Sequence, residues 1–518
     1  MLGGFMNNFF LMYSFAVLFY MISSSFAVDI YPGDNWRTIA GNNPAGTTYI
    51  IKAGRHLRQT VDNLQDGDSF IGETGAVMDG DNRTEYAFYA PGVNNVTIKN
   101  LEITGYTPRE QYAVIECTQW LMGSTCGSGW VIDSCIIHHN DGVGLRFGDN
   151  FIVTNNYIHH QLQLGIGGSG TGARIENNEI AFCHYSGTYD DNTLIEEGGA
   201  KFVYTTGLVV RGNYVHHNRG PGLWTDINNI NTLYEENLVD SNAAYGIFHE
   251  ISWAATIRCN ICRGNGKFHD YNTPVGWGWG SGIMITNSSD VECYNNIVIT
   301  DPDSGDGIVM LQSVRTDPVG QRYLNDNYVH DNDITYTSNR GCSGMAVDDQ
   351  SVKGSGNRFD YNHYRVPDPG GEYWLWHSTD DGSWFDNWTT MQSRGQEEHG
   401  TCDADDSSPS SMPGCALSVS THHASLPGTR PQLRIGRYSL PIENITACTV
   451  AMYTPSGRLV WSRTFDNLAS WGNASALIPR ARNGRPISAG MYVVRTTFDK
   501  GSVAQQQRIF SGTVAYVP

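Results

Sequence analysis

The chain has 518 residues, a formal net charge of −19 and a pI near 5.2, and only 16% of its residues are charged. This length exceeds that of one ordinary domain, although a repeat solenoid can take up roughly 300 residues as a single unit. The acidity is typical of a soluble surface, and because the sequence carries no basic stripe we do not expect nucleic acid as a partner. The 58 glycines and 11% aromatic residues are typical of a turn-rich β protein that presents rings to sugars.

Residues 1–27 form an apolar leader ending in Ser-Ser-Ser-Phe-Ala, with Ser25 and Ala27 at the cleavage positions. The leader predicts a signal peptide and a mature chain from about Val28. A membrane anchor is the alternative, because no Lys or Arg precedes the apolar run. No other apolar stretch is long enough to span a bilayer. We therefore expect a secreted or cell-surface protein with no membrane span once the leader is removed.

Two markers repeat along the middle of the chain. Glycine leads short apolar segments at Gly144, Gly165, Gly222, Gly246, Gly282, Gly307 and Gly344. Asparagine stands two residues before an apolar residue at Asn156, Asn178, Asn213, Asn237, Asn260 and Asn296. The asparagines recur every 22 to 24 residues, with two longer intervals of 35 and 36 residues. Short β-branched segments at this period predict a solenoid of parallel strands in which the asparagine amides stack from coil to coil.

These repeats resemble the right-handed parallel β-helix repeat family over about residues 50–364. The segment 46–80, which contains GTTYIIKAGRHLRQTV and DGDSFIGETGAVMDG, is similar to the first coils of secreted bacterial members. The resemblance implies an all-β, right-handed parallel β-helix. It also implies activity on polysaccharides as a hydrolase, lyase or epimerase, because the fold hosts several chemistries.

A candidate site follows when GTYDDN (187–192), GLWTDI (222–227) and GIFHEI (246–251) are set in register. Stacked as neighbouring strands, they place an aromatic column beside an acidic column on one exposed face. The aromatic column is Tyr189, Trp224 and Phe248, and the acidic column is Asp191, Asp226 and Glu250. Two insertions, 192–206 with Lys201 and 263–281 with Trp277 and Trp279, are predicted to flank the columns and bind substrate.

The acidic column predicts a glycoside hydrolase. Carboxylates on neighbouring strands lie about 5 Å apart, and those two coils apart lie about 9–10 Å apart. Retaining glycosidases use about 5–5.5 Å and inverting ones about 6.5–9.5 Å. We expect Asp226 and Glu250 to be the catalytic pair, with Asp191 assisting them or ligating a cation.

Two alternatives remain open. In a calcium-dependent uronate lyase or epimerase, the three carboxylates would bind calcium and Lys201 or His249 would be the base, although His249 has inward parity. A non-catalytic glycan-binding adhesin would use the columns for recognition alone. We assign no certain cofactor or metal ligand, and expect a monomer whose partner is a polysaccharide.

Cysteine and histidine patterns are assigned structural roles. We expect disulfides within the pairs Cys117/Cys126 and Cys402/Cys415, and buried coil cysteines at Cys259 and Cys262. Paired histidines occur at His138/His139, His159/His160 and His216/His217. Because Ala181 and Phe182 interrupt this column, we expect the histidines to line turns and not to bind a metal.

The domain organisation follows from changes in composition. We expect an N-terminal cap and first coils over 28–95, the β-helix with an aromatic C-terminal cap over 96–400, a Ser-, Asp- and Pro-rich linker over 401–432, and a small β-sandwich over 433–518. The motifs VAMYTPSGRLVW (450–461) and ISAGMYVVRTTF (487–498) resemble the immunoglobulin-like sorting module of type IX-secreted bacterial enzymes. The resemblance implies export to the surface, although the chain ends Val-Ala-Tyr-Val-Pro instead of the usual Lys-ending tail.

Overall fold

The computed structural model describes residues 27–518 except for sixteen segments. These segments are 119–125, 185–197, 267–277, 279, 303–304, 316–319, 379–384, 405–407, 410, 416–431, 436–437, 442–444, 454–458, 466–489 and 501–507, together with 517–518 at the end. The predicted signal peptide lies outside the described residues, apart from Ala27. No described helix is long and apolar enough to cross a membrane.

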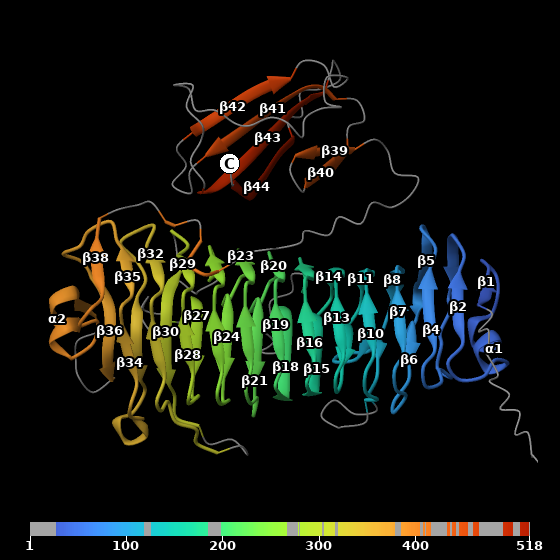
Figure 1. Cartoon of the computed structure of the whole chain (residues 1–518), viewed down its shortest axis with the longest axis horizontal. Helices are drawn as coiled ribbons and strands as arrows, with labels where there is room; N and C mark the ends of the chain where they lie inside the picture. The colour runs from blue at the N-terminus through green and yellow to red at the C-terminus, as the bar shows by residue number, and fades with distance from the viewer. Residues whose placement is uncertain are drawn as a thin grey trace, which may run out of the picture.

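The described residues before 404 form a right-handed parallel β-helix of three long sheets, whose strands lie side by side along the long axis (Figure 1). We call these sheets A, B and C, and from β4 to β36 each coil contributes one strand to each sheet in that order. The prediction of a right-handed parallel β-helix is confirmed.

Sheet A has 13 described strands. They are β1 (Val28–Ile30), β2 (Thr48–Ile51), β4 (Ser69–Gly72), β7 (Thr97–Lys99), β10 (Val131–Asp133), β13 (Ile152–Thr154), β16 (Arg174–Glu176), β19 (Val209–Arg211), β22 (Leu233–Glu235), β25 (Thr256–Arg258), β28 (Glu292–Tyr294), β31 (Tyr328–His330) and β34 (Arg358–Asp360).

Sheet B also has 13 described strands. They are β3 (Gly54–Leu57), β5 (Ala76–Thr84), β8 (Glu102–Tyr106), β11 (Ile136–Asn140), β14 (Tyr157–Gln161), β17 (Glu179–Ala181), β20 (Tyr214–His216), β23 (Leu238–Asp240), β26 (Ile261–Arg263), β29 (Ile297–Ile299), β32 (Asp333–Thr335), β35 (His363–Arg365) and β38 (Thr401–Asp403).

Sheet C has 12 described strands and carries the candidate site. They are β6 (Phe88–Tyr89), β9 (Ala113–Glu116), β12 (Val143–Phe147), β15 (Leu164–Thr171), β18 (Gly198–Thr206), β21 (Leu223–Asp226), β24 (Ile247–Glu250), β27 (Ser281–Thr286), β30 (Asp306–Gln312), β33 (Ser343–Val347), β36 (Glu372–Ser378) and β37 (Asp386–Asn387). A 3₁₀ turn, η2 (Gln350–Val352), follows β33.

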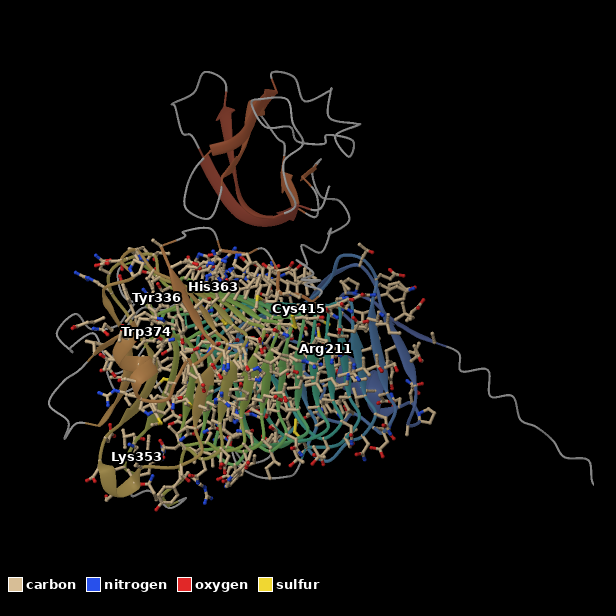
Figure 2. The ribbon with its side chains drawn as sticks, turned by 60° about the vertical axis from the view of Figure 1, so that its left-hand side comes forward. Arg211, Tyr336, Lys353, His363, Trp374 and Cys415 are labelled. Atoms are coloured by element: carbon tan, nitrogen blue, oxygen red, sulfur yellow. A yellow bond between two sulfur atoms is a disulfide. The ribbon has the colours of Figure 1, made fainter. Side chains whose placement is uncertain are left out.

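Inward side chains of the three sheets form one hydrophobic core that runs from Ile30 to Met391. Each end of this core is closed by a short helix. At the N-terminal end, α1 (Trp36–Gly41) buries Trp36, whose ring stacks on Phe70. At the other end, α2 (Trp388–Ser393) packs Trp388 against Trp374, which Figure 2 labels. These caps cover end strands that would otherwise be open edges, as the aromatic run after residue 372 predicts.

The predicted asparagine ladder is present. The Nδ2 of Asn178 and its backbone N–H both donate to Oδ1 of Asn213, at 3.1 and 3.0 Å. The same pattern continues through Asn237, Asn260, Asn296, Asn332 and Asn362. The ladder ends where Asn362 Nδ2 donates to Oε1 of Glu397 at 2.8 Å. Each amide therefore satisfies a buried backbone group at a corner, which explains why Asn marks the repeat.

The cysteine prediction is partly wrong. Cys117 and Cys126 form the expected disulfide, and Cys262 is buried in the core. However, Cys415 is bonded to Cys259, and Cys402 is a free thiol (Figure 2 labels Cys415). Cys402 lies in β38, where its strand pairs with β35, so its position in the sheet separates it from the segment that carries Cys415.

The predicted linker is also shorter than expected at its start. Residues 401–403 are strand β38, which pairs in parallel with β35 and so belongs to the β-helix.

After residue 431, the described strands are antiparallel. One sheet has β39 (Gln432–Ile435) and β40 (Tyr438–Pro441). The other has β41 (Ile445–Tyr453), β42 (Leu459–Phe465), β43 (Gly490–Lys500) and β44 (Arg508–Tyr516).

Candidate active site

The register of sheet C confirms the predicted pairing of segments 222–227 and 246–251. It corrects the predicted position of segment 187–192. Leu223 pairs with Ile247 and Trp224 pairs with Phe248, as expected. The strand on the other side of β21 is β18, in which Lys201 pairs with Trp224 and Val203 pairs with Asp226. The segment 187–192 is therefore not the strand beside β21, and its alignment with 222–227 was wrong.

A glycine contact explains the error. The coil before β21 holds two Gly-led segments, at Gly187 and at Gly199. The segment in the sheet is the one at Gly199, where a Cβ would collide with the carbonyl oxygen of Gly222. The same close approach recurs between Gly222 and Gly246. Only glycine fits at this corner, so the residue that contacts the next coil identifies the strand.

Four of the predicted site residues lie outside the described residues: Tyr189, Asp191, Trp277 and Trp279. Lys201, predicted to lie on an insertion, instead lies on strand β18. Its Nζ is 3.0 Å from Oδ2 of Asp226 and 3.9 Å from the centre of the Trp224 ring. The structure thus brings Lys201, Trp224 and Asp226 together on the outer face of sheet C.

Glu250 lies on the next strand and has a different cationic partner. Arg315 Nη1 is 2.9 Å from Glu250 Oε1. Burial and the nearby negative charge of Asp226 raise the pKa of Glu250 to about 7, against the opposing effects of Arg315 and Lys201. The two carboxylates are close enough to interact, yet each is held by its own cation.

The rings beside these carboxylates are stacked. Trp224 and Phe248 lie 5.4 Å apart with an angle of 14° between their planes, and Tyr245 packs against Phe248 at 4.6 Å. This arrangement follows from the register, because residues paired on neighbouring parallel strands point to the same face. The predicted aromatic column therefore exists at these two positions.

The face is not exposed, contrary to the prediction. Trp224, Asp226 and Phe248 are 4%, 6% and 5% exposed. Further along sheet C, Trp224 and Phe248 continue into an outer apolar cluster that contains Met284, Val309, Leu311, Cys342, Ala346 and Leu375. Within this buried setting, Oδ1 of Asp226 and Nε1 of Trp224 have no hydrogen-bond partner among the described residues.

His249 has the inward orientation that its parity predicts. It is fully buried, and its Nδ1 lies 2.7 Å from Oγ1 of Thr225, which also accepts from the hydroxyl of Tyr234. Burial lowers the pKa of His249 to about 3. The ring is therefore a neutral core group on the opposite side of the sheet from Glu250.

Several residues of this face were missed by sequence reasoning. Arg315 comes from the chain after β30, 65 residues beyond Glu250, and no repeat marker points to it. Arg146 lies two coils before Lys201 at the equivalent position, because Arg146 pairs with Gly167 and Gly167 pairs with Lys201. Arg146 forms a buried ion pair with Glu116 at 3.4 Å. The repeat of the Gly-led strands does predict that Arg146 lies on this face. Arg146 stands two residues after Gly144, as Trp224 stands two residues after Gly222.

Comparisons with known proteins agree with this fold. The family model described as the right handed beta helix region matches residues 121–298, less than half of the chain. No curated protein matches the sequence.

Several solved structures are similar in fold at low identity. The A-module of the mannuronan C-5 epimerase AlgE6 of Azotobacter vinelandii has 14% identity and a TM-score of 0.46, over 71% of this chain and 92% of that one. A mannuronic acid specific polysaccharide family 6 lyase from human gut microbiota has 12% identity and a TM-score of 0.43, over 71% and 93%. The catalytic unit of a GH87 alpha-1,3-glucanase of Streptomyces thermodiastaticus has 12% identity and a TM-score of 0.36, over 73% and 68%. The strand topology and the family match together establish the chain as a right-handed parallel β-helix.

Proposed function

We propose that this protein is a glycoside hydrolase that cleaves a polysaccharide with Asp226 and Glu250 as its carboxylate pair. One observation carries the proposal. The buried carboxylate of Asp226 and the partly buried one of Glu250 lie on adjacent strands of sheet C, each paired with a different cation, beside the stacked rings of Trp224 and Phe248. Paired carboxylates whose environments differ are the arrangement that separates an acid from a base.

The environments assign the roles. Glu250, with a pKa of about 7, holds a proton near neutral pH and is the general acid. It donates this proton to the glycosidic oxygen as the bond from that oxygen to the anomeric carbon breaks. Asp226 attacks the anomeric carbon and forms the glycosyl ester. Glu250 then takes a proton from the water that hydrolyses the ester.

The spacing predicts the stereochemistry. Positions on adjacent strands lie about 4.8 Å apart, close to the roughly 5–5.5 Å of retaining glycosidases. A water molecule does not fit between carboxylates at that distance, so we propose retention. Trp277 and Trp279, which the sequence predicts beside this face, would contact the substrate.

A uronate lyase or epimerase is the second candidate, and the cations favour it. Lys201 and Arg315 would meet the carboxylate of an acidic sugar, and Lys201 would be the group that moves the proton. Calcium fits this face poorly, because both carboxylates already have cationic partners. A glycan-binding adhesin without catalysis is the third candidate and requires only the rings.

We also propose secretion or a cell-surface location, through the leader 1–27 and a sorting function of the C-terminal sheets, and a monomeric protein.

A product assay on a panel of neutral and acidic polysaccharides tests the function. New reducing ends without an unsaturated product support hydrolysis. Ultraviolet absorbance from an unsaturated uronate indicates β-elimination, a changed uronate composition without cleavage indicates epimerisation, and retention on immobilised glycan without product indicates binding alone.

A further inference from the structure

The histidine pairs meet at one corner of the β-helix, away from the candidate active site. His139, His160 and His217 all have left-handed backbone conformations, with φ of 50°, 52° and 54°. Each is preceded by a histidine on sheet B, so the pairs occupy equivalent positions in their coils. Sequence reasoning assigned them to turns, and that is where they lie.

The first two pairs form a compact block of four imidazoles. His138 stacks on His159 at 4.9 Å, and His139 stacks on His160 at 4.6 Å. Within each pair, the two Nδ1 atoms are 2.8 Å apart. One ring nitrogen from each of His139, His159 and His160 lies within 4.8 Å of the other two. Because His159 and His160 share an N–H···N contact, an ion bound by both rings would displace the proton between their Nδ1 atoms.

A carboxylate fixes the tautomers on one side of this block. Oε1 of Glu102 lies 3.2 Å from Nε2 of His138, so this nitrogen carries the proton and donates it to Glu102. His138 Nδ1 is then an acceptor, and the 2.8 Å contact requires His139 Nδ1 to donate to it. The lone pair of His139 is consequently on Nε2. Glu102 thus orients His139 through His138, whereas the usual outer support of a metal-bound imidazole is a carboxylate that accepts from the ligating ring directly.

We propose that His139, His159 and His160 bind a divalent transition ion of the zinc class, with His138 and Glu102 as positioning residues. Neutral imidazole nitrogens suit zinc, copper and nickel, whereas calcium and magnesium take oxygen ligands. A zinc ion lies about 2.0–2.1 Å from each nitrogen, so the donors must approach within about 4 Å of one another. The three donor atoms lie within 4.8 Å of one another, so the rings must move closer together to bind the ion, and His139 is the most exposed of the three.

The third pair provides an internal control. His216 and His217 have the same Nδ1 contact, at 3.0 Å, and His216 has its own carboxylate, Glu179, at 3.2 Å. The neighbouring coil, however, presents Phe182, whose ring contacts those of His160 and His217, at 5.2 and 5.3 Å between ring centres. This corner therefore offers two imidazoles where the first block offers four. The bound ion would link β11 to β14 and so stabilise the folded state.

Zinc titration of the full chain tests the proposal, with competition against a chromophoric chelator to measure affinity. We expect one zinc ion per chain, a rise in melting temperature with zinc and no rise with calcium. His139→Gln and His160→Gln should each weaken zinc binding about 10- to 100-fold, whereas His217→Gln should leave it unchanged.

A measurement on the wild-type chain covers the case in which a variant does not fold. Zinc should protect His139, His159 and His160 from diethyl pyrocarbonate, as mapped by mass spectrometry, and leave His217 reactive. The proposal is overturned if zinc does not bind, if His139→Gln and His160→Gln bind it as tightly as wild type, or if protection falls on other histidines.

Discussion

The Lys201 ammonium and the Asp226 carboxylate form an ion pair of 3.0 Å in which 6% and 9% of the two side chains are exposed. Such burial makes the loss of one partner costly, because the remaining charge is left without compensation. Lys201→Met should lower the free energy of unfolding by about 3–5 kcal/mol in urea titrations.

Lys99→Met is the matched control for this variant. Lys99 pairs with Asp133 at 2.6 Å, but its side chain is 42% exposed. An exposed pair contributes about 0–1 kcal/mol, so the control should change stability little. Equal losses in the two variants would contradict the special contribution of the buried Lys201–Asp226 pair to stability.

The asparagine ladder should contribute measurably at each step. Asn213→Ala removes the acceptor of two bonds from Asn178 and leaves buried donors without a partner. A loss of about 1–3 kcal/mol for each unsatisfied group is expected. Thermal and urea unfolding measure this, with Asn42→Ala, at an exposed position with a right-handed backbone conformation, as the control. A ladder variant as stable as its control would contradict the role of the amides.

Stability should fall as pH rises from about 4.5 to 7. Burial raises the pKa of Glu397 from 4.5 to about 7, so the folded chain holds a proton there that the unfolded chain has lost. The folded state binds more protons and is therefore favoured at low pH. This contribution to the free energy of unfolding is lost as the pH rises through 7. Glu250 and Asp306, whose pKa is also raised to about 7, act in the same direction.

Glu397→Gln tests the contribution of that residue, which also ends the asparagine ladder. The variant should lose part of the pH dependence of unfolding between pH 4.5 and 7, on the order of a few kcal/mol. Glu398→Gln, on the exposed neighbour, should keep the wild-type slope. If Glu397→Gln leaves the pH dependence of the free energy of unfolding unchanged, the Glu397 carboxyl does not contribute to it.

The Cys259–Cys415 disulfide should hold the segment after β38 to the β-helix. Limited proteolysis between residues 404 and 414 should therefore yield fragments that separate only under reducing conditions. Cys415→Ser should release them without reductant, whereas Cys402→Ser should behave as wild type. Release from the unreduced wild-type chain by a cut in that interval would contradict the pairing.

The repeat made most of the fold predictable, because a shared period fixes both the strands and their inward faces. Leu223 and Ile247 were placed on one face by parity alone, and sheet C confirms it. Parity does not decide between two Gly-led segments within one long coil, so the strand containing Lys201 was misassigned. Arg315 was not predictable, because a contact 65 residues away depends on how the chain after β30 returns to Glu250. The Cys259–Cys415 bond was missed for the same reason, since proximity in sequence favoured Cys402.

The catalytic pair is tested most directly by turnover of the amide variants on the polysaccharide that the wild-type chain cleaves. Asp226→Asn and Glu250→Gln preserve shape, and each should lower kcat at least about 100-fold, as loss of a general acid or nucleophile does. Glu292→Gln, on an exposed position of sheet A, should keep full activity. Full activity in both amide variants, with folding intact, would contradict the assignment of Asp226 and Glu250 to the chemistry.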